Sequence, residues 1–270
     1  MNTNGLLEHP ASRTLLITLR IRSQEDDLPD GMFKDPGARK AVEGLPPEVF
    51  SFPVNHMMRV GTAVRVRYFD DLTRSFLHDK ENPVIVQLGC GLDTRFSRTD
   101  SGKGVQINMD LPEVMRLRQE LFPQPDERCL DWTGSILDRD WMHRLQQDYA
   151  GRNFLFIAEG VLMYLREAEV RSLLRDLADN FPGAHIAFDT SGSFVCKKMN
   201  KNSAVSKLNA EMTWGYDHDG SLDKWHPRLR RLDMAFYFNR FRQRWGLTCL
   251  LHYFPPLGRA SLMHYFAFAG

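Results

Sequence analysis

Short apolar runs alternate with amphipathic stretches through the middle of the chain. Five of these runs have the length and residue types of buried strands, and they lie at 84–88, 105–109, 128–130, 154–158 and 185–189. Apolar residues at helical spacing predict helices at 10–23, 60–76, 112–121, 141–149 and 166–180. Strands that alternate with helices predict an α/β fold, with a largely parallel sheet covered on both faces.

The C-terminal part of the chain departs from this alternation. Residues 191–227 are polar and irregular but carry several aromatic side chains, which is typical of a binding loop or lid. The pattern then predicts a helix at 229–245. Two apolar runs follow at 247–254 and 262–268, and the Pro-Pro-Leu-Gly turn between them predicts a long antiparallel hairpin.

A glycine turn follows the first predicted strand directly. Gly89 and Gly91 form a Gly-x-Gly motif there, and Asp110 ends the next strand. Gly91 has no Cβ, so the backbone can come close to a bulky ligand. The Asp110 carboxylate can accept hydrogen bonds from two ribose hydroxyls, although it could also cap the helix that begins at 112. Together these residues predict a pocket for an adenosine-type cofactor.

The residues after the turn bear on the identity of that cofactor. A dinucleotide site usually has a third glycine where this chain has Thr94. Pyrophosphate prefers bare amides at a helix N-terminus, and the anionic Asp93 would oppose it. S-adenosylmethionine (SAM) carries a sulfonium and an ammonium and no phosphate. The residues therefore favour SAM over NAD, with an ordinary strand–turn–helix as the alternative.

The run LGCGLDTR, together with further segments in the same order, resembles the signature of the leucine carboxyl methyltransferase family. That family also includes polyketide O-methyltransferases. The further matching segments lie at 65–71, 109–114, 134–141 and 158–165. The likeness covers about residues 30–190 and implies a Rossmann-like class I methyltransferase fold, with SAM as cofactor. We expect one such domain over 1–270, with residues 1–80 as a helical cap, 191–227 as a lid insertion and a C-terminal antiparallel hairpin.

The turn and the resemblance together give a set of expected cofactor contacts. The set is Arg65, Gly89, Gly91, Asp110, Leu111, Leu137, Asp138 and Glu159. The resemblance gives Arg65 the SAM carboxylate, with Arg67 as an alternative, because a guanidinium can bind a carboxylate through two parallel hydrogen bonds. It places Leu137 and Asp138 at the adenine, with the Asp138 carboxylate accepting from the exocyclic amine.

Glu159 follows an apolar strand, so its carboxylate must be paired or lie at a cavity mouth. Its partner would be the SAM ammonium, or Arg65 if the pair is structural. Gly89, Asp110, Asp138 and Glu159 all fall at or after predicted strand ends. Ligands of such sheets bind at the carboxyl ends of the strands, so we expect these four residues to converge on one rim.

Methyl transfer from SAM is an in-line displacement, which mainly requires alignment of acceptor oxygen, methyl and sulfur in a dry pocket. A carboxylate acceptor needs no base, whereas a phenol or enol would gain from one. The candidates for a base are Tyr164, Tyr216, His56, His218 and His226. Each alone is more often a packing or surface residue, so the catalytic residue stays unassigned.

Composition limits the expected partners, metal content and cellular location of the protein. The chain has 270 residues and a formal charge of +1, so no basic excess points to nucleic acid. Its four cysteines are widely spaced without a CxxC motif, which fits a reduced intracellular protein and gives no zinc signature. No uninterrupted apolar segment suggests a signal peptide or a membrane span, so we expect a cytoplasmic location.

These observations predict a SAM-dependent O-methyltransferase. The acceptor would be a carboxyl or hydroxyl oxygen of a small molecule, such as a polyketide-like specialised metabolite. The alternatives are a protein C-terminal carboxyl methyltransferase, a non-catalytic SAM-fold binding protein and, more remotely, an NAD oxidoreductase. Intact Asp110 and Glu159 count against the non-catalytic alternative, because a dead site has no evident need for buried acids. Nothing in the sequence indicates the oligomeric state.

Overall fold

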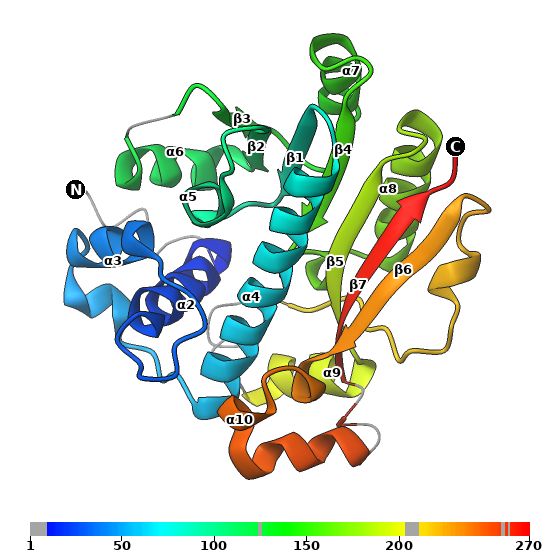
Figure 1. Ribbon diagram of the computed structural model, residues 1–270. Coiled ribbons are helices and arrows are strands. Elements are labelled where there is room, and N and C mark those ends of the chain that lie inside the picture. The colour runs from blue at the N-terminus through cyan, green and yellow to red at the C-terminus, as the bar shows by residue number, and fades with distance from the viewer. Residues whose placement is uncertain (1–9, 124–125, 203–210, 255–256, 259) are drawn as a thin grey trace.

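The computed structural model describes residues 10–123, 126–202, 211–254, 257–258 and 260–270. A seven-stranded sheet runs through it in the order β3-β2-β1-β4-β5-β7-β6 (Figure 1). The strands are β1 (Pro83–Leu88), β2 (Val105–Asp110), β3 (Cys129–Thr133), β4 (Asn153–Ala158), β5 (His185–Ser191), β6 (Leu229–Phe236) and β7 (Ser261–Phe268). Strands β1 to β5 are parallel, and β7 pairs antiparallel with both β5 and β6. The predicted fold class is confirmed.

Helices lie on both faces of this sheet, and each face has its own hydrophobic core. The α-helices are α2 (Pro10–Glu25), α3 (Pro36–Glu43), α4 (His56–Asp79), α5 (Arg95–Thr99), α6 (Pro112–Leu121), α7 (Asp140–Asp148), α8 (Glu167–Asn180), α9 (Ser193–Asn202) and α10 (Arg242–Trp245). Alternate residues of β4 divide between the two cores. Phe154 and Phe156 pack with α7 and α8, whereas Leu155 and Ile157 pack with α4, which crosses the sheet (Figure 1). A strand covered on both sides explains the continuous apolar runs of the sequence.

Short 3₁₀ helices occupy several of the connections. They are η1 (Pro47–Phe50), η2 (Leu162–Tyr164), η4 (Leu222–Lys224), η5 (Tyr237–Asn239) and η6 (Gly246–Tyr253). A third hydrophobic cluster joins α2 and α3 to Leu92 after β1 and to Leu117 on α6. The N-terminal helices are therefore packed against the segment that follows the first strand. No helix within the described part of the chain is both long and apolar enough to cross a membrane.

Two expectations for the C-terminal part are wrong. Residues 229–245 do not form one helix, because the segment begins as β6 and continues through η5 into α10. Residues 247–254 are not a strand but lie mainly in η6, where Leu247 is 86% exposed. The terminal strand pair is therefore formed by β6 and β7, with Leu229 opposite Phe268 and Phe236 opposite Leu262.

The physical reason lies in backbone pairing. Strand β7 pairs with β5 along one edge. The amide and carbonyl groups of its other edge need partners, and β6 supplies them. Leu229 and Ala235 of β6 are buried while Arg230 is exposed, and a register shift between Arg231 and Asp233 interrupts the alternation. The segment 191–227 is also more regular than expected, since β5 extends to Ser191 and α9 follows it. Residues 203–210, 255 and 256 lie outside the described part.

Candidate active site

A cavity of about 660 Å³ opens at the carboxyl ends of β1, β2, β4 and β5. Its walls come from α2 and α4 on one side and from the segments after β1, β3 and β4 on the other. Residues of α9 and η5 complete it. The cavity therefore lies where ligands bind in sheets of this topology.

The glycine turn after β1 forms part of the cavity wall. Gly89 and Gly91 have φ angles of +70° and +53°, in the region that favours glycine. A Cβ on Gly89 would lie 2.6 Å from Cγ2 of Val161, and one on Gly91 would lie 2.6 Å from Cδ2 of Leu15. Backbone conformation therefore favours glycine at both positions, and the close approach of Val161 adds a steric reason at Gly89.

Asp110 ends β2 beside this turn. Its carboxylate accepts a hydrogen bond from the amide of Gly91 at 2.7 Å and from the amide of Leu111 at 2.8 Å. Helix α6 begins after Leu111 without a side-chain cap, so Asp110 braces the turn rather than capping the helix. Burial raises the pKa of Asp110 despite these two amides. One carboxylate can accept several hydrogen bonds, so capacity remains for a ligand hydroxyl.

Arg65 and Glu159 meet across the cavity wall. Nε of Arg65, on α4, donates to Oε1 of Glu159 at 3.0 Å, and Nη1 donates to Oδ2 of Asp189 at 3.2 Å. Burial raises the pKa of Asp189, whose Oδ1 also accepts from the amide of Gly160 at 2.6 Å. Tyr237 donates to the same carboxylate at 3.2 Å. The site thus brings together one guanidinium group and two carboxylates, which come from three different parts of the fold.

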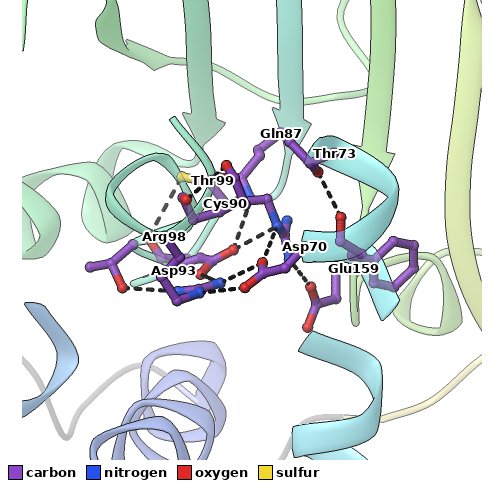
Figure 2. Close-up of polar contacts among 12 residues, drawn as sticks. Asp70, Thr73, Gln87, Cys90, Asp93, Arg98, Thr99 and Glu159 are labelled. Atoms are coloured by element: carbon purple, nitrogen blue, oxygen red, sulfur yellow. Dashed lines mark hydrogen bonds and ion pairs between the residues drawn. The ribbon is translucent and has the colours of Figure 1, made fainter. Parts of the chain in front are cut away.

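A buried ion network connects Glu159 to the glycine turn (Figure 2). Arg95 is fully buried and pairs with Glu159, with Asp70 at 3.0 Å and with Asp93 at 3.2 Å. Arg98 joins the same network through Asp70 and Asp93 (Figure 2). The nearby guanidinium groups hold the pKa of Asp93 well below its usual range although burial opposes this. Because its charge is compensated, Asp93 opposes pyrophosphate less than the sequence indicated.

The structure brings most of the expected cofactor contacts to the cavity. Those that line it are Arg65, Gly89, Gly91, Asp110, Leu111, Leu137 and Glu159. Asp138 is exposed and does not line the cavity, although it directly follows Leu137. Arg67 points elsewhere, because it pairs with Asp71 and donates to the carbonyl of Met32. Three of the four predicted strand-end residues therefore converge on one rim, namely Gly89, Asp110 and Glu159, and Asp138 does not.

The base candidates are mostly remote from the cavity. Tyr164 lines it, and burial raises the pKa of its hydroxyl. Tyr216 is buried in the core and accepts from the amide of Gly220, while His226 lies 3.2 Å from Asp179. Neither lines the cavity, and the same holds for His56 and His218. Of the five side chains that the sequence offered as a base, Tyr164 is thus the one that lines the cavity.

The segment after β5 contributes aliphatic and sulfur-containing side chains rather than aromatic ones. Val195 and Met199 of α9 line the cavity together with Met212. Trp214 and Tyr216, in contrast, are buried in the core beneath this segment. The aromatic residues therefore anchor the segment by packing. No sequence pattern indicates the lining residues of α2, among them Arg22, because their role depends on how that helix docks.

The sheet order, the glycine turn and the carboxylate at the end of β2 define a class I SAM-dependent methyltransferase. A model of the leucine carboxyl methyltransferase family matches residues 18–178, and the chain belongs to this family. The family, the enzyme class and the cofactor predicted from the sequence are confirmed.

Two relatives agree with this assignment, and a solved structure shares the fold. The chain is 27% identical over 236 residues to tetracenomycin polyketide synthesis O-methyltransferase TcmP of Streptomyces glaucescens, covering 87% of this chain and 82% of the relative. It is 27% identical over 255 residues to the SAM-dependent methyltransferase dpfgK of Gibberella zeae, with coverages of 86% and 84%. A DUF574 family protein of Streptomyces avermitilis shares the fold, with a TM-score of 0.57, 13% identity and coverages of 94% and 97%.

Proposed function

We propose that this enzyme transfers the methyl group of SAM to a carboxyl or hydroxyl oxygen of a small, largely apolar molecule of the polyketide type. The observation that carries the proposal is that one cavity is lined both by the glycine turn with Asp110 and by largely apolar side chains of α9 and η5. The relation to TcmP, whose name places it in polyketide synthesis, supports the acceptor class.

The residues of the cavity fit SAM. Gly89 and Gly91 leave a cradle that a Cβ would narrow, and Asp110 is placed to accept from the ribose hydroxyls. Arg65 would bind the carboxylate of SAM and Glu159 its ammonium. Because this arginine and this glutamate already lie side by side, the zwitterionic end of SAM meets one group of each charge.

The adenine would lie against the segment after β3. Leu137 is 41% exposed at the cavity and offers an apolar surface to a flat base. Asp138 is the next residue along the chain, and we propose that its carboxylate accepts from the exocyclic amine. Leu111, 38% exposed and also lining the cavity, would cover the ribose side.

SAM, when bound, supplies a methyl group activated by its sulfonium. The chain itself aligns the acceptor oxygen with that group and excludes water from the path. Tyr164 lines the cavity, and burial raises the pKa of its hydroxyl, so it is a neutral donor near pH 7, whereas Tyr237 already donates to Asp189. Neutral hydroxyl groups can orient an acceptor oxygen by hydrogen bonding without removing a proton from it.

The cavity is rich in sulfur-containing and aromatic side chains. Methionines that line the cavity are Met57, Met58, Met163, Met199 and Met212. Methionine adapts its shape to irregular ligands and makes favourable contacts with aromatic rings. Trp245 and Phe238 also line the cavity, with their ring centroids 4.7 Å apart. This lining fits an apolar ring system better than a free amino acid.

The proposal is tested with SAM labelled in its methyl group and a panel of aromatic carboxylic acids and phenols. We expect label in at least one small molecule, and at least about tenfold less with Asp110→Ala at a limiting SAM concentration. Mild alkali then distinguishes the acceptors, because a methyl ester is hydrolysed whereas a methyl ether is stable. Label found only in C-terminal peptides would favour the protein carboxyl methyltransferase instead. The absence of transfer to every acceptor, despite SAM binding, would favour the non-catalytic protein.

A further inference from the structure

The glycine turn is held from behind by an arginine that does not line the cavity. Nη1 of Arg118, on α6, donates to the carbonyl oxygen of Gly91 at 3.3 Å and also to the carbonyl oxygen of Asp93. Nε of the same side chain donates to Oδ1 of Asp131 on β3 at 3.0 Å. Arg118 is 5% exposed, so these bonds form away from solvent. The guanidinium therefore ties the backbone of the turn to the edge of the sheet.

A second arginine holds the carbonyl group between these two. Nη2 of Arg22, on α2, donates to the carbonyl oxygen of Leu92 at 2.6 Å. Three successive carbonyl groups, at 91, 92 and 93, are thus bound by guanidinium groups. The amide of Gly91 is meanwhile bound by Asp110 on the cavity side. The turn is fixed on both sides, with its carbonyl groups and its amide bound to different partners.

We propose that Arg118 is a positioning residue for SAM, which sets cofactor affinity by holding the turn 89–93 in its binding conformation. This inference rests on the proposed placement of the cofactor at the turn. Glycine loses more backbone freedom on ordering than any other residue, so an unclamped Gly-x-Gly turn would sample several conformations. Ordering the turn before binding removes that entropic cost from the binding step.

The geometry requires arginine and not simply a positive charge. Arg118 contacts Asp131 through Nε and the two carbonyl groups through Nη1, so its planar group spans partners from two elements. A lysine ammonium is a compact charge at the end of a flexible chain and cannot reproduce this fork. We therefore expect Arg118→Lys to retain the fold but to loosen the turn.

The experiment compares Arg118→Lys and Arg118→Met with Arg116→Lys, a control on the exposed face of the same helix. Calorimetry with S-adenosylhomocysteine (SAH) should show dissociation constants raised about tenfold or more for Arg118→Met and less for Arg118→Lys. Hydrogen exchange without ligand should accelerate at the amides of 89–94 in both variants. The control should match the wild type in both measurements. A merely structural role would lower the melting temperature without this local change.

Asp131→Asn provides a second route, because it weakens the anchor of Arg118 without touching the turn. It should raise the dissociation constant for SAH by a smaller factor, and it decides the question with Arg118→Lys if Arg118→Met fails to fold. Wild-type affinity in Arg118→Lys and Asp131→Asn would overturn the inference.

Asp110→Asn is measured in parallel. If Asp110→Asn and the Arg118 variants all bind SAH normally, the proposed cofactor placement fails. If only Asp110→Asn weakens binding, the placement stands and the role of Arg118 fails.

Discussion

Arg65 and Glu159 lie 3.0 Å apart, from Nε to Oε1, although 94 positions separate them in the sequence. The arginine comes from the helix α4 and the glutamate follows β4, so the pair joins this helix to the sheet. Both side chains are only partly buried, at 16% and 13% exposure. Their pairing keeps each charge compensated and leaves both at the cavity. The methionine end of SAM, which we propose to bind there, carries the same two charges.

Replacement of Arg65 tests this pairing. Arg65→Ala leaves Glu159 and Asp189 without their shared cation, and SAM loses the proposed partner of its carboxylate. We expect the dissociation constant for SAM to rise by about tenfold to a hundredfold, as for a lost charge-assisted hydrogen bond. Calorimetry checks this against Arg67→Ala, whose arginine pairs with Asp71 away from the cavity. Equal losses of affinity in the two variants would refute the assignment.

Asp110 is the second residue for which we predict a direct effect. Asp110→Ala removes the proposed acceptor of the ribose hydroxyls and the acceptor of the Gly91 amide. The affinity for SAH should fall by at least about tenfold. Glu120→Gln, an exposed change on α6, serves as the control and should bind normally. Unchanged affinity in Asp110→Ala would remove the ribose assignment.

Alanine variants at Gly91 and Gly102 distinguish the effect of backbone strain from an effect on ligand binding. Both have positive φ angles, +53° and +77°, so alanine at either position costs about 1–2 kcal/mol of stability. A Cβ at Gly91 would also meet Leu15 at 2.6 Å, whereas Gly102 has open space around it. We expect both variants to melt earlier but only Gly91→Ala to lose SAH affinity. A binding defect in Gly102→Ala would show that strain alone explains the effect.

His185 predicts a pH dependence of stability. Burial, with Lys80 nearby, lowers the pKa of His185 to about 4, so its ring stays neutral in the folded protein at mildly acidic pH. The unfolded chain takes up this proton near pH 6.5, so the free energy of unfolding falls as the pH drops from about 6.5 to 4. The ring is only half-buried, so water limits the effect to about 1 kcal/mol.

Urea unfolding at pH 7 and pH 5 checks this prediction. In His185→Gln the difference between the two pH values should shrink by that amount relative to the wild type. His78→Gln, which alters an exposed histidine beside Asp79, should behave like the wild type. A pH difference unchanged in His185→Gln would contradict the account.

Much of the site could be predicted because its residues lie next to strand ends. Gly89 and Gly91 follow β1 directly and Asp110 ends β2, so a local pattern places them at one edge of the sheet. Arg118 and Arg22 could not be found in this way. Their contacts with the turn span 25 and 70 positions and depend on which helix face meets it. Asp138 does not line the cavity, because the position of a strand end does not fix the course of the next loop, and its contact with adenine stays a proposal.

The fold was predicted well where periodicity and burial agree. Helix α6 has the predicted bounds, and β1 is buried along its whole length. The pattern failed where tertiary pairing decides the structure. The segment at Leu229 becomes a strand because β7 offers an edge, while the apolar run at Leu247 has no such partner and coils on the surface. Short apolar runs of this kind suit strand and helix equally.

Calorimetry of the purified protein with SAM, SAH and NAD tests the central claim, that the cavity beside the glycine turn is a SAM site. We predict micromolar binding of SAM and SAH, weakened at least about tenfold in Asp110→Ala, and no heat of binding with NAD. Binding of NAD, or no binding of SAM by the folded wild type, would contradict the account.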